Sequence, residues 1–178
     1  MKIIQGKYKG IVLKGFDIDG TRPTMDRVKE SLFAMIQNNI KDKNTLDLFA
    51  GSGNLGIEAL SMGAKSVYFV DKNPIAIKTI KENLNKIKIE SQVLKNDYKD
   101  ALKAFENKTK FDLIFLDPPY KTNYIEESLK LIERYDLLNK DGLVVCESDD
   151  VNKIKYSNYY QEYKNRKYSE KIVVILKR

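Results

Sequence analysis

Short apolar segments typical of β-strands alternate with segments of helical periodicity along most of this 178-residue sequence. Five strands are predicted in this region, at residues 45–50, 66–71, 91–97, 111–117 and 142–148. Helices are predicted to begin near residues 24, 57, 73, 98 and 123. Strands that alternate with helices form a parallel sheet with helices on both faces. We therefore expect an α/β fold with a Rossmann-like, doubly wound sheet.

The two ends of the chain depart from this alternation. Residues 2–14 predict two short strands around Gly6 and Gly10, so residues 1–20 are expected to form a small N-terminal β-hairpin extension. Residues 159–178 predict two more strands joined by a turn, which brings the mostly parallel sheet to seven strands. No repeat, linker or low-complexity stretch interrupts the sequence, so we expect a single domain over residues 1–178.

Composition removes several kinds of active site. The sequence has no histidine, which excludes Ser-His-Asp triads, histidine metal sites and imidazole general bases, and no metal site is predicted. The one cysteine, Cys146, cannot form an internal disulfide and is expected to be a buried small apolar residue, and a reducing cytoplasm is expected. No apolar run is long enough to span a membrane. The net charge of +7 rests on 27 lysines and 5 arginines, and alone it leaves nucleic-acid binding open.

Three predicted strands end on residues that suit an adenosine-containing ligand. Gly51, Gly53 and Gly56 form a G-x-G-x-x-G turn between a strand and a helix, which allows close approach of an anionic or polar group. Asp71, twenty residues after Gly51, could accept hydrogen bonds from both ribose hydroxyls. Asp97 could reach an adenine amino group, although it could equally be a solvated loop residue. NAD and S-adenosylmethionine fit these features equally well.

A fourth strand end, Asp117-Pro118-Pro119-Tyr120, separates the two ligands. Hydride transfer has no use for this group, whereas methylation of an exocyclic amine does. The carboxylate of Asp117 and the carbonyl of Pro118 can accept hydrogen bonds from an aryl amine and free its lone pair, while Tyr120 stacks on the base. Such orientation can lower the barrier by several kcal/mol. The alternative is that the two prolines merely end the strand for packing.

The motifs "LDLFAGSGNLGIEAL" and "DPPY" resemble those of class I S-adenosylmethionine-dependent methyltransferases that modify exocyclic amines. "GKYKG" followed by "RPTMDRVKESLF" resembles the RsmD family more narrowly, over about residues 2–147. The resemblance implies methylation of a guanine N2 in 16S rRNA of the small ribosomal subunit or its assembly intermediate, a last strand that is antiparallel, and a monomer. It implies a target-base site at Asp117, Pro118, Pro119 and Tyr120, and a cofactor site at Asp47, Phe49, Gly51, Gly53, Asp71 and Asp97.

Two of the five arginines, Arg22 and Arg27, lie in the block that carries this resemblance. Arginine binds phosphate through two parallel hydrogen bonds, which lysine does not, so both are predicted to contact the RNA backbone. Further RNA contacts are predicted in the N-terminal hairpin, at Lys2, Lys7, Tyr8 and Lys9. The alternative is a solvated helix start with an internal ion pair, for example from arginine to Glu30.

Four other functions compete with this hypothesis. An adenine-N6 DNA methyltransferase would share the core motifs, but 178 residues leave no room for a separate DNA-reading domain. A non-catalytic RNA-binding protein would not need the intact strand ends. A nicotinamide-dependent oxidoreductase leaves the Asp117 motif without a purpose. A protein glutamine methyltransferase usually carries asparagine where Asp117 stands.

Overall fold

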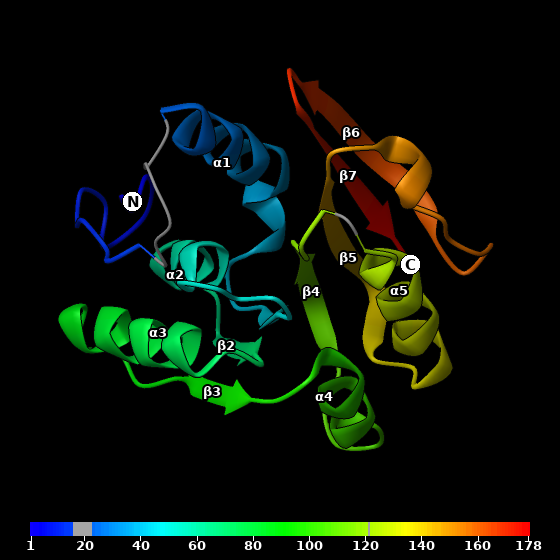
Figure 1. Ribbon diagram of the computed structural model, residues 1–178, viewed down its shortest axis with the longest axis horizontal. Helices are drawn as coiled ribbons and strands as arrows, with labels where there is room; N and C mark the ends of the chain where they lie inside the picture. Colours follow the sequence, from blue (N-terminus) through cyan, green and yellow to red (C-terminus); the bar gives the residue numbers. More distant parts are fainter. Residues whose placement is uncertain (16–22, 121) are drawn as a thin grey trace.

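A computed structural model describes residues 1–15, 23–120 and 122–178 of the chain, and its centre is a seven-stranded sheet with the order β3-β2-β1-β4-β5-β7-β6 (Figure 1). The first five strands are parallel: β1 (Asn44–Asp47), β2 (Ser66–Asp71), β3 (Gln92–Lys95), β4 (Phe111–Leu116) and β5 (Leu138–Ser148). The last strand, β7 (Lys171–Lys177), lies between β5 and β6 (Gln161–Tyr168) and is antiparallel to both. The expected seven-stranded, mostly parallel sheet with an antiparallel last strand is confirmed.

Helices cover both faces of this sheet, as expected (Figure 1). On one face, α1 (Pro23–Ile36), α2 (Asn54–Ser61) and α3 (Pro74–Lys86) bury an apolar cluster that includes Leu32, Phe69 and Phe115. On the other face, α4 (Tyr98–Phe105) and α5 (Tyr124–Arg134) bury a second cluster that includes Leu116 and Cys146. Two short 3-10 helices, Gln37–Asn39 and Val151–Lys153, also lie within the described residues. Neighbouring strand residues alternate between the two clusters because successive side chains point to opposite faces.

The starts of two helices follow from local sequence. Asn73 caps α3 by accepting a hydrogen bond from the Ile75 backbone N–H, and Pro74 occupies the first helical position, where a missing N–H costs nothing. Asp97 caps α4 in the same way through the N–H of Lys99. Strand β1 ends at Asp47, three residues earlier than expected, because the chain then enters the glycine-rich turn. Strand β5 is longer than expected and begins at Leu138.

The N-terminal segment is a hairpin, but the two strands expected there are reduced to a single antiparallel bridge between Lys2 and Val12. The reason is that its turn packs against α2: the Lys7 N–H donates to the Ser61 carbonyl, and a Cβ on Gly6 would lie 1.9 Å from that oxygen. Ile3 and Leu13 are buried in the same cluster as α1 and α2. The hairpin is thus part of the folded body rather than a projecting arm. Residues 16–20 of the expected extension lie outside the described residues.

Strand order reverses between β1 and β4, which are hydrogen-bonded neighbours although they are far apart in sequence. In sheets of this kind, ligands bind at the carboxyl ends of the strands beside such a reversal. Cys146, in the adjacent strand β5, is fully buried in the cluster under α4 and α5, as expected for a small apolar residue. Among the described residues, no helix is both long and apolar enough to cross a bilayer.

Candidate active site

A cleft in two connected parts lies along the carboxyl ends of the central strands. The larger part, of about 410 Å³, is bounded by residues that follow β1, β2, β3 and β4. The smaller part, of about 280 Å³, lies between the sheet edge and α1. Phe49, Gly51 and Asp117 line both parts, so the two communicate at the point where β1 and β4 end. The cleft therefore brings together the strand-end residues that the sequence singled out.

The glycine-rich turn is held in place by two of the predicted carboxylates. Asp71 accepts hydrogen bonds from the Gly51 N–H on one oxygen, at 2.9 Å, and from the Asn73 N–H on the other, at 2.8 Å. A carboxylate offers about four acceptor positions, so Asp71 keeps two for a ligand while it fixes the turn. Asp47 accepts the N–H of Gly56 at 2.9 Å. A Cβ on Gly56 would lie 2.3 Å from the Phe69 ring, so this glycine allows close helix–strand packing.

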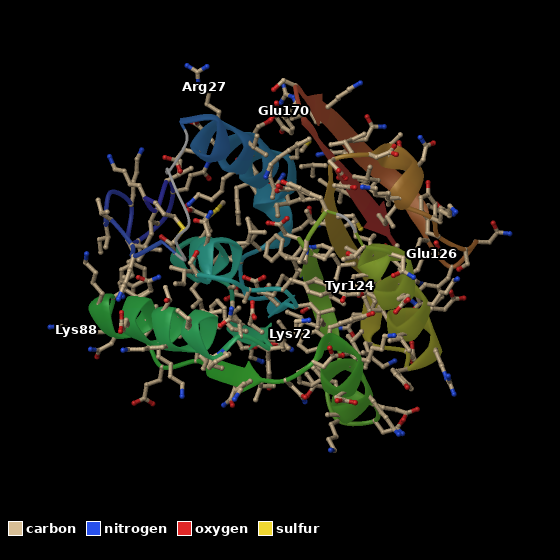
Figure 2. All side chains as sticks on the ribbon, viewed as in Figure 1. Arg27, Lys72, Lys88, Tyr124, Glu126 and Glu170 are labelled. Carbon is tan, nitrogen blue, oxygen red and sulfur yellow. The ribbon has the colours of Figure 1, made fainter. Side chains whose placement is uncertain are left out.

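Three aromatic rings form one wall of the larger part. Phe49 lies 5.3 Å from Tyr98 and is stacked 6.0 Å from Tyr124, which is labelled in Figure 2. Asp97 lies on the same wall, since it lines the cavity and also caps α4. Of these rings only Phe49 was predicted. Tyr98 and Tyr124 are the first residues of α4 and α5. A helix that begins soon after the end of β3 is a signal that could have indicated Tyr98, whereas seven residues separate Tyr124 from the end of β4.

Asp117 lies immediately after β4 and is half-buried between the two parts of the cleft. None of the described residues donates a hydrogen bond to its carboxylate. Burial raises the pKa of Asp117 well above its usual range, the charge of Glu147 raises it further, and Lys171 opposes both. Burial also raises the pKa of Asp47 to about 7, against the effect of the Gly56 N–H. The cleft therefore holds two carboxyl groups whose ionisation is costly while it is empty.

Tyr120, the last residue of the predicted motif, lies beside an ion pair that sequence reasoning missed. Lys171 and Glu147 form this pair at the start of β7 and the end of β5. The Lys171 ammonium lies 5.3 Å from the centre of the Tyr120 ring, and the Tyr120 hydroxyl lies 3.4 Å from Glu147 Oε1. Lys153 donates to the Tyr120 carbonyl at 2.7 Å. Pro118 and Pro119 line the larger part of the cleft with Tyr120.

The residues predicted to contact RNA lie outside the cleft. Arg27 is exposed at the start of α1 and points away from the body of the protein (Figure 2), and no ion pair with Glu30 is found among the described residues. Lys2, Lys7 and Lys9 are exposed, whereas Tyr8 is half-buried, with its N–H bonded to Ser61 Oγ. Arg22 lies outside the described residues. Contact of these groups with RNA therefore stays a prediction.

Comparison with known proteins places this geometry in a family. The chain matches the family model described as "Conserved hypothetical protein 95", which corresponds to the RsmD family, over residues 1–177. The chain belongs to the RsmD family. The family match includes β6 and β7, where the motifs recognised in the sequence are weakest.

Named relatives and solved structures agree with RsmD membership. The chain is 47% identical over 152 residues to "Putative rRNA methyltransferase YlbH" of Bacillus subtilis, covering 84% of this chain and 83% of that one. It is 38% identical to "Ribosomal RNA small subunit methyltransferase D" of Haemophilus influenzae, covering 84% and 79%. The structure titled "Putative methyltransferase yhhF from Escherichia coli" superimposes with a TM-score of 0.90 at 29% identity, covering 100% and 97%.

Proposed function

We propose that this protein is a methyltransferase that uses S-adenosylmethionine to methylate the exocyclic N2 amine of a guanine in 16S rRNA. Its substrate is the small ribosomal subunit or an assembly intermediate of it, and the protein acts as a cytoplasmic monomer. The observation that carries the proposal is the position of Asp117, whose carboxylate lies between two connected cavities with no hydrogen-bond donor among the described residues. Names of RsmD relatives that refer to rRNA and to the small subunit support the choice of substrate.

The residues of the cleft fit S-adenosylmethionine better than a nicotinamide dinucleotide. Five carboxylates line the two parts of the cleft, against three lysines: Asp47, Asp71, Asp97, Asp117 and Glu147 against Lys29, Lys72 and Lys171. Two of the lysines are already paired with carboxylates. This excess of acidic groups, of which Asp47 and Asp117 ionise more readily when a cation is bound, favours a sulfonium cation with an ammonium group and opposes a pyrophosphate. Asp71 would accept the ribose hydroxyls, Asp97 the adenine amine, and Phe49 would contact the adenine ring.

The bound cofactor supplies an electrophilic methyl group, and the protein supplies the orientation of the amine. Asp117 and the Pro118 carbonyl accept the two N–H groups of the target amine, which directs its lone pair toward the glycine-rich turn. Tyr120 presents its ring to the base. Orientation of this kind can lower the barrier by several kcal/mol. The amine becomes acidic as it is methylated, and Asp117, whose pKa is raised by burial, can take its proton.

One experiment tests the proposal directly. Small ribosomal subunits from a strain that lacks this protein should be incubated with the purified protein and S-adenosylmethionine, and the rRNA nucleosides analysed by mass spectrometry. We expect one N2-methylguanosine per subunit, absent from subunits of the deletion strain and restored by the protein. In a parallel incubation with DNA, N6-methyladenine as the only product would support the DNA methyltransferase instead, and no product in either incubation would support a non-catalytic RNA-binding protein.

A further inference from the structure

The ion pair between Glu147 and Lys171 lies in line with Asp117 across three adjacent strands. The register of β4 with β5 pairs Leu116 with Cys146, so Asp117 and Glu147 are the next residues on neighbouring strands. The register of β5 with β7 pairs Glu147 with Val173, and Lys171 is two residues before Val173. Adjacent strands are about 4.8 Å apart. The three side chains therefore form a row of carboxylate, carboxylate and ammonium along the sheet edge.

All three side chains point to the same face of the sheet. Leu116 and Cys146 belong to the cluster under α4 and α5, so the residues after them face α1. Val173 belongs to the cluster under α1, and Lys171 shares its face because side chains repeat every two residues. All three residues also line the smaller part of the cleft. A ligand in the smaller part of the cleft would therefore contact this row of three side chains.

The pair keeps hydrogen-bonding capacity for a ligand. Both side-chain hydrogen bonds of Glu147 within the described residues, from Lys171 and from Tyr120, go to Oε1, which leaves Oε2 to accept another. The Lys171 ammonium has three N–H donors, of which Glu147 takes one. Glu147 is 7% exposed, so a ligand group that failed to use Oε2 would leave a desolvated carboxylate oxygen without a partner.

We propose that Glu147 and Lys171 recognise the Watson–Crick edge of the target base and select guanine over adenine. The edge of guanine presents the N2 amine, the N1–H donor and the O6 acceptor in that order. With the amine at Asp117, the N1–H meets Glu147 and O6 meets Lys171. Adenine with its N6 amine at Asp117 presents the N1 lone pair next, which would face a carboxylate. The inference rests on the proposed function, because it assumes that the substrate amine binds at Asp117.

The base analogue 2-aminopurine separates recognition from chemistry. It keeps the exocyclic amine at position 2 but lacks O6 and carries an acceptor at N1. Small subunits should be reconstituted with guanine or 2-aminopurine at the methylated position, and single-turnover methylation rates compared. We expect the wild-type protein to prefer guanine by about a hundredfold or more, as sites with buried polar partners do. In the double variant Glu147→Gln, Lys171→Met this preference should fall at least tenfold.

A matched control lies on the same two strands. Lys177 of β7 pairs with Asp141 of β5 at the other end of these strands, and Lys177→Met, Asp141→Asn should leave the preference unchanged. A merely structural role of the Glu147–Lys171 pair would slow both substrates equally and preserve the ratio. The inference is overturned if the double variant keeps the wild-type preference for guanine over 2-aminopurine, or if the wild-type protein methylates both at the same rate. In either case, methylation of guanine still upholds the proposed function. Absence of guanine methylation by the wild-type protein overturns both.

Discussion

At the scale of single residues, the cleft is dominated by carboxyl groups that are expensive to ionise until a ligand arrives. Asp47 is the last residue of β1 and Asp117 follows the neighbouring strand β4, and burial raises the pKa of both. In the folded protein without ligand, each carboxyl therefore binds its proton more tightly than in the unfolded chain. Their contribution to the free energy of unfolding is greatest below about pH 4 and is lost as the pH rises through the raised value, which for Asp47 is about 7. A bound cation offsets this cost.

Cofactor affinity should therefore depend on pH. S-adenosylmethionine is cationic, so its binding favours ionised Asp47 and should release a proton when the pH is below about 7. We expect the affinity to rise as the pH is raised from 6 toward 7 and to level off above it. Calorimetry in two buffers with different ionisation enthalpies measures both the affinity and the proton release. Asp47→Asn should remove most of the dependence, and a pH-independent affinity in the wild-type protein would contradict the assignment of Asp47.

Replacing Asp117 should separate catalysis from cofactor binding. Asp117→Ala removes the acceptor of the target amine, and we expect the single-turnover rate on small subunits to fall by at least about a hundredfold. Affinity for S-adenosylhomocysteine should change little, because that ligand carries no target amine. Tyr120→Phe keeps the ring that stacks on the base and serves as the control, whereas Tyr120→Ala should slow methylation substantially. If Asp117→Ala methylates at the wild-type rate, Asp117 does not bind the target amine, and Pro118 and Pro119 only end the strand.

At the scale of elements, the N-terminal hairpin is joined to the cleft by a buried ion pair. Glu58 of α2 is fully buried and accepts hydrogen bonds from the backbone N–H groups of Ile4 and Gln5. It also pairs with Lys29 of α1 at 2.8 Å. Lys29 in turn donates to Asn54, which opens the helix after the glycine-rich turn. The hairpin, α1 and α2 therefore stabilise one another, and removing the hairpin would leave these charges without partners.

The stability of the whole fold should therefore depend on Glu58. Glu58→Gln keeps the shape but leaves Lys29 as an uncompensated buried charge, and breaking such pairs costs about 3–5 kcal/mol. Denaturant unfolding followed by circular dichroism measures the loss. Glu82→Gln is the matched control, because Glu82 pairs with Lys14 of the same hairpin at the exposed surface. An equally small effect of both substitutions would show that the hairpin is only loosely attached.

Features that depend on local sequence could be predicted, whereas features that depend on contacts between distant residues could not. Asp71 and Asp117 each end a run of apolar, strand-forming residues, which is a local signal, whereas Asp47 lies inside such a run and was assigned only from the family resemblance. The pairing of Glu147 with Lys171 depends on the insertion of β7 between β5 and β6, which no local pattern specifies. The burial of the hairpin likewise depends on contacts between residues more than fifty positions apart. The ion pair and the buried hairpin were missed because they depend on long-range packing rather than on strand or helix preference.

At the scale of the whole molecule, charge is unevenly distributed. The chain carries a net charge of +7, yet the lining of the cleft has more carboxylates than lysines. The positive charge must therefore lie mainly outside the cleft, where exposed groups such as Lys7, Lys9 and Arg27 are found. A protein arranged in this way would hold the RNA backbone at its rim and admit only a neutral base into its acidic interior.

Affinity for the small subunit should accordingly fall as salt is added. The logarithm of the association constant should decrease linearly with the logarithm of salt concentration, with a slope set by the number of phosphate contacts. Arg27→Ala should make this slope shallower by about one. Arg134→Ala is the control, because Arg134 is an exposed arginine at the far end of α5. Equal slopes for Arg27→Ala and the wild-type protein would remove Arg27 from the RNA-binding surface.

Because Cys146 is buried, the rate at which its thiol is labelled should report how often the sheet opens. Cys146 carries the single thiol of the chain and is 0% exposed in β5, between β4 and β7. Burial also raises the pKa of this thiol. A thiol-reactive reagent should therefore not modify Cys146 while the sheet is intact. Labelling should then proceed only through the rare conformations in which the centre of the sheet opens. Saturation with S-adenosylhomocysteine stabilises the folded chain, and the labelling rate should fall by the same factor as the population of the open conformations. The kinetics of one native thiol would thus measure ligand affinity without an engineered probe.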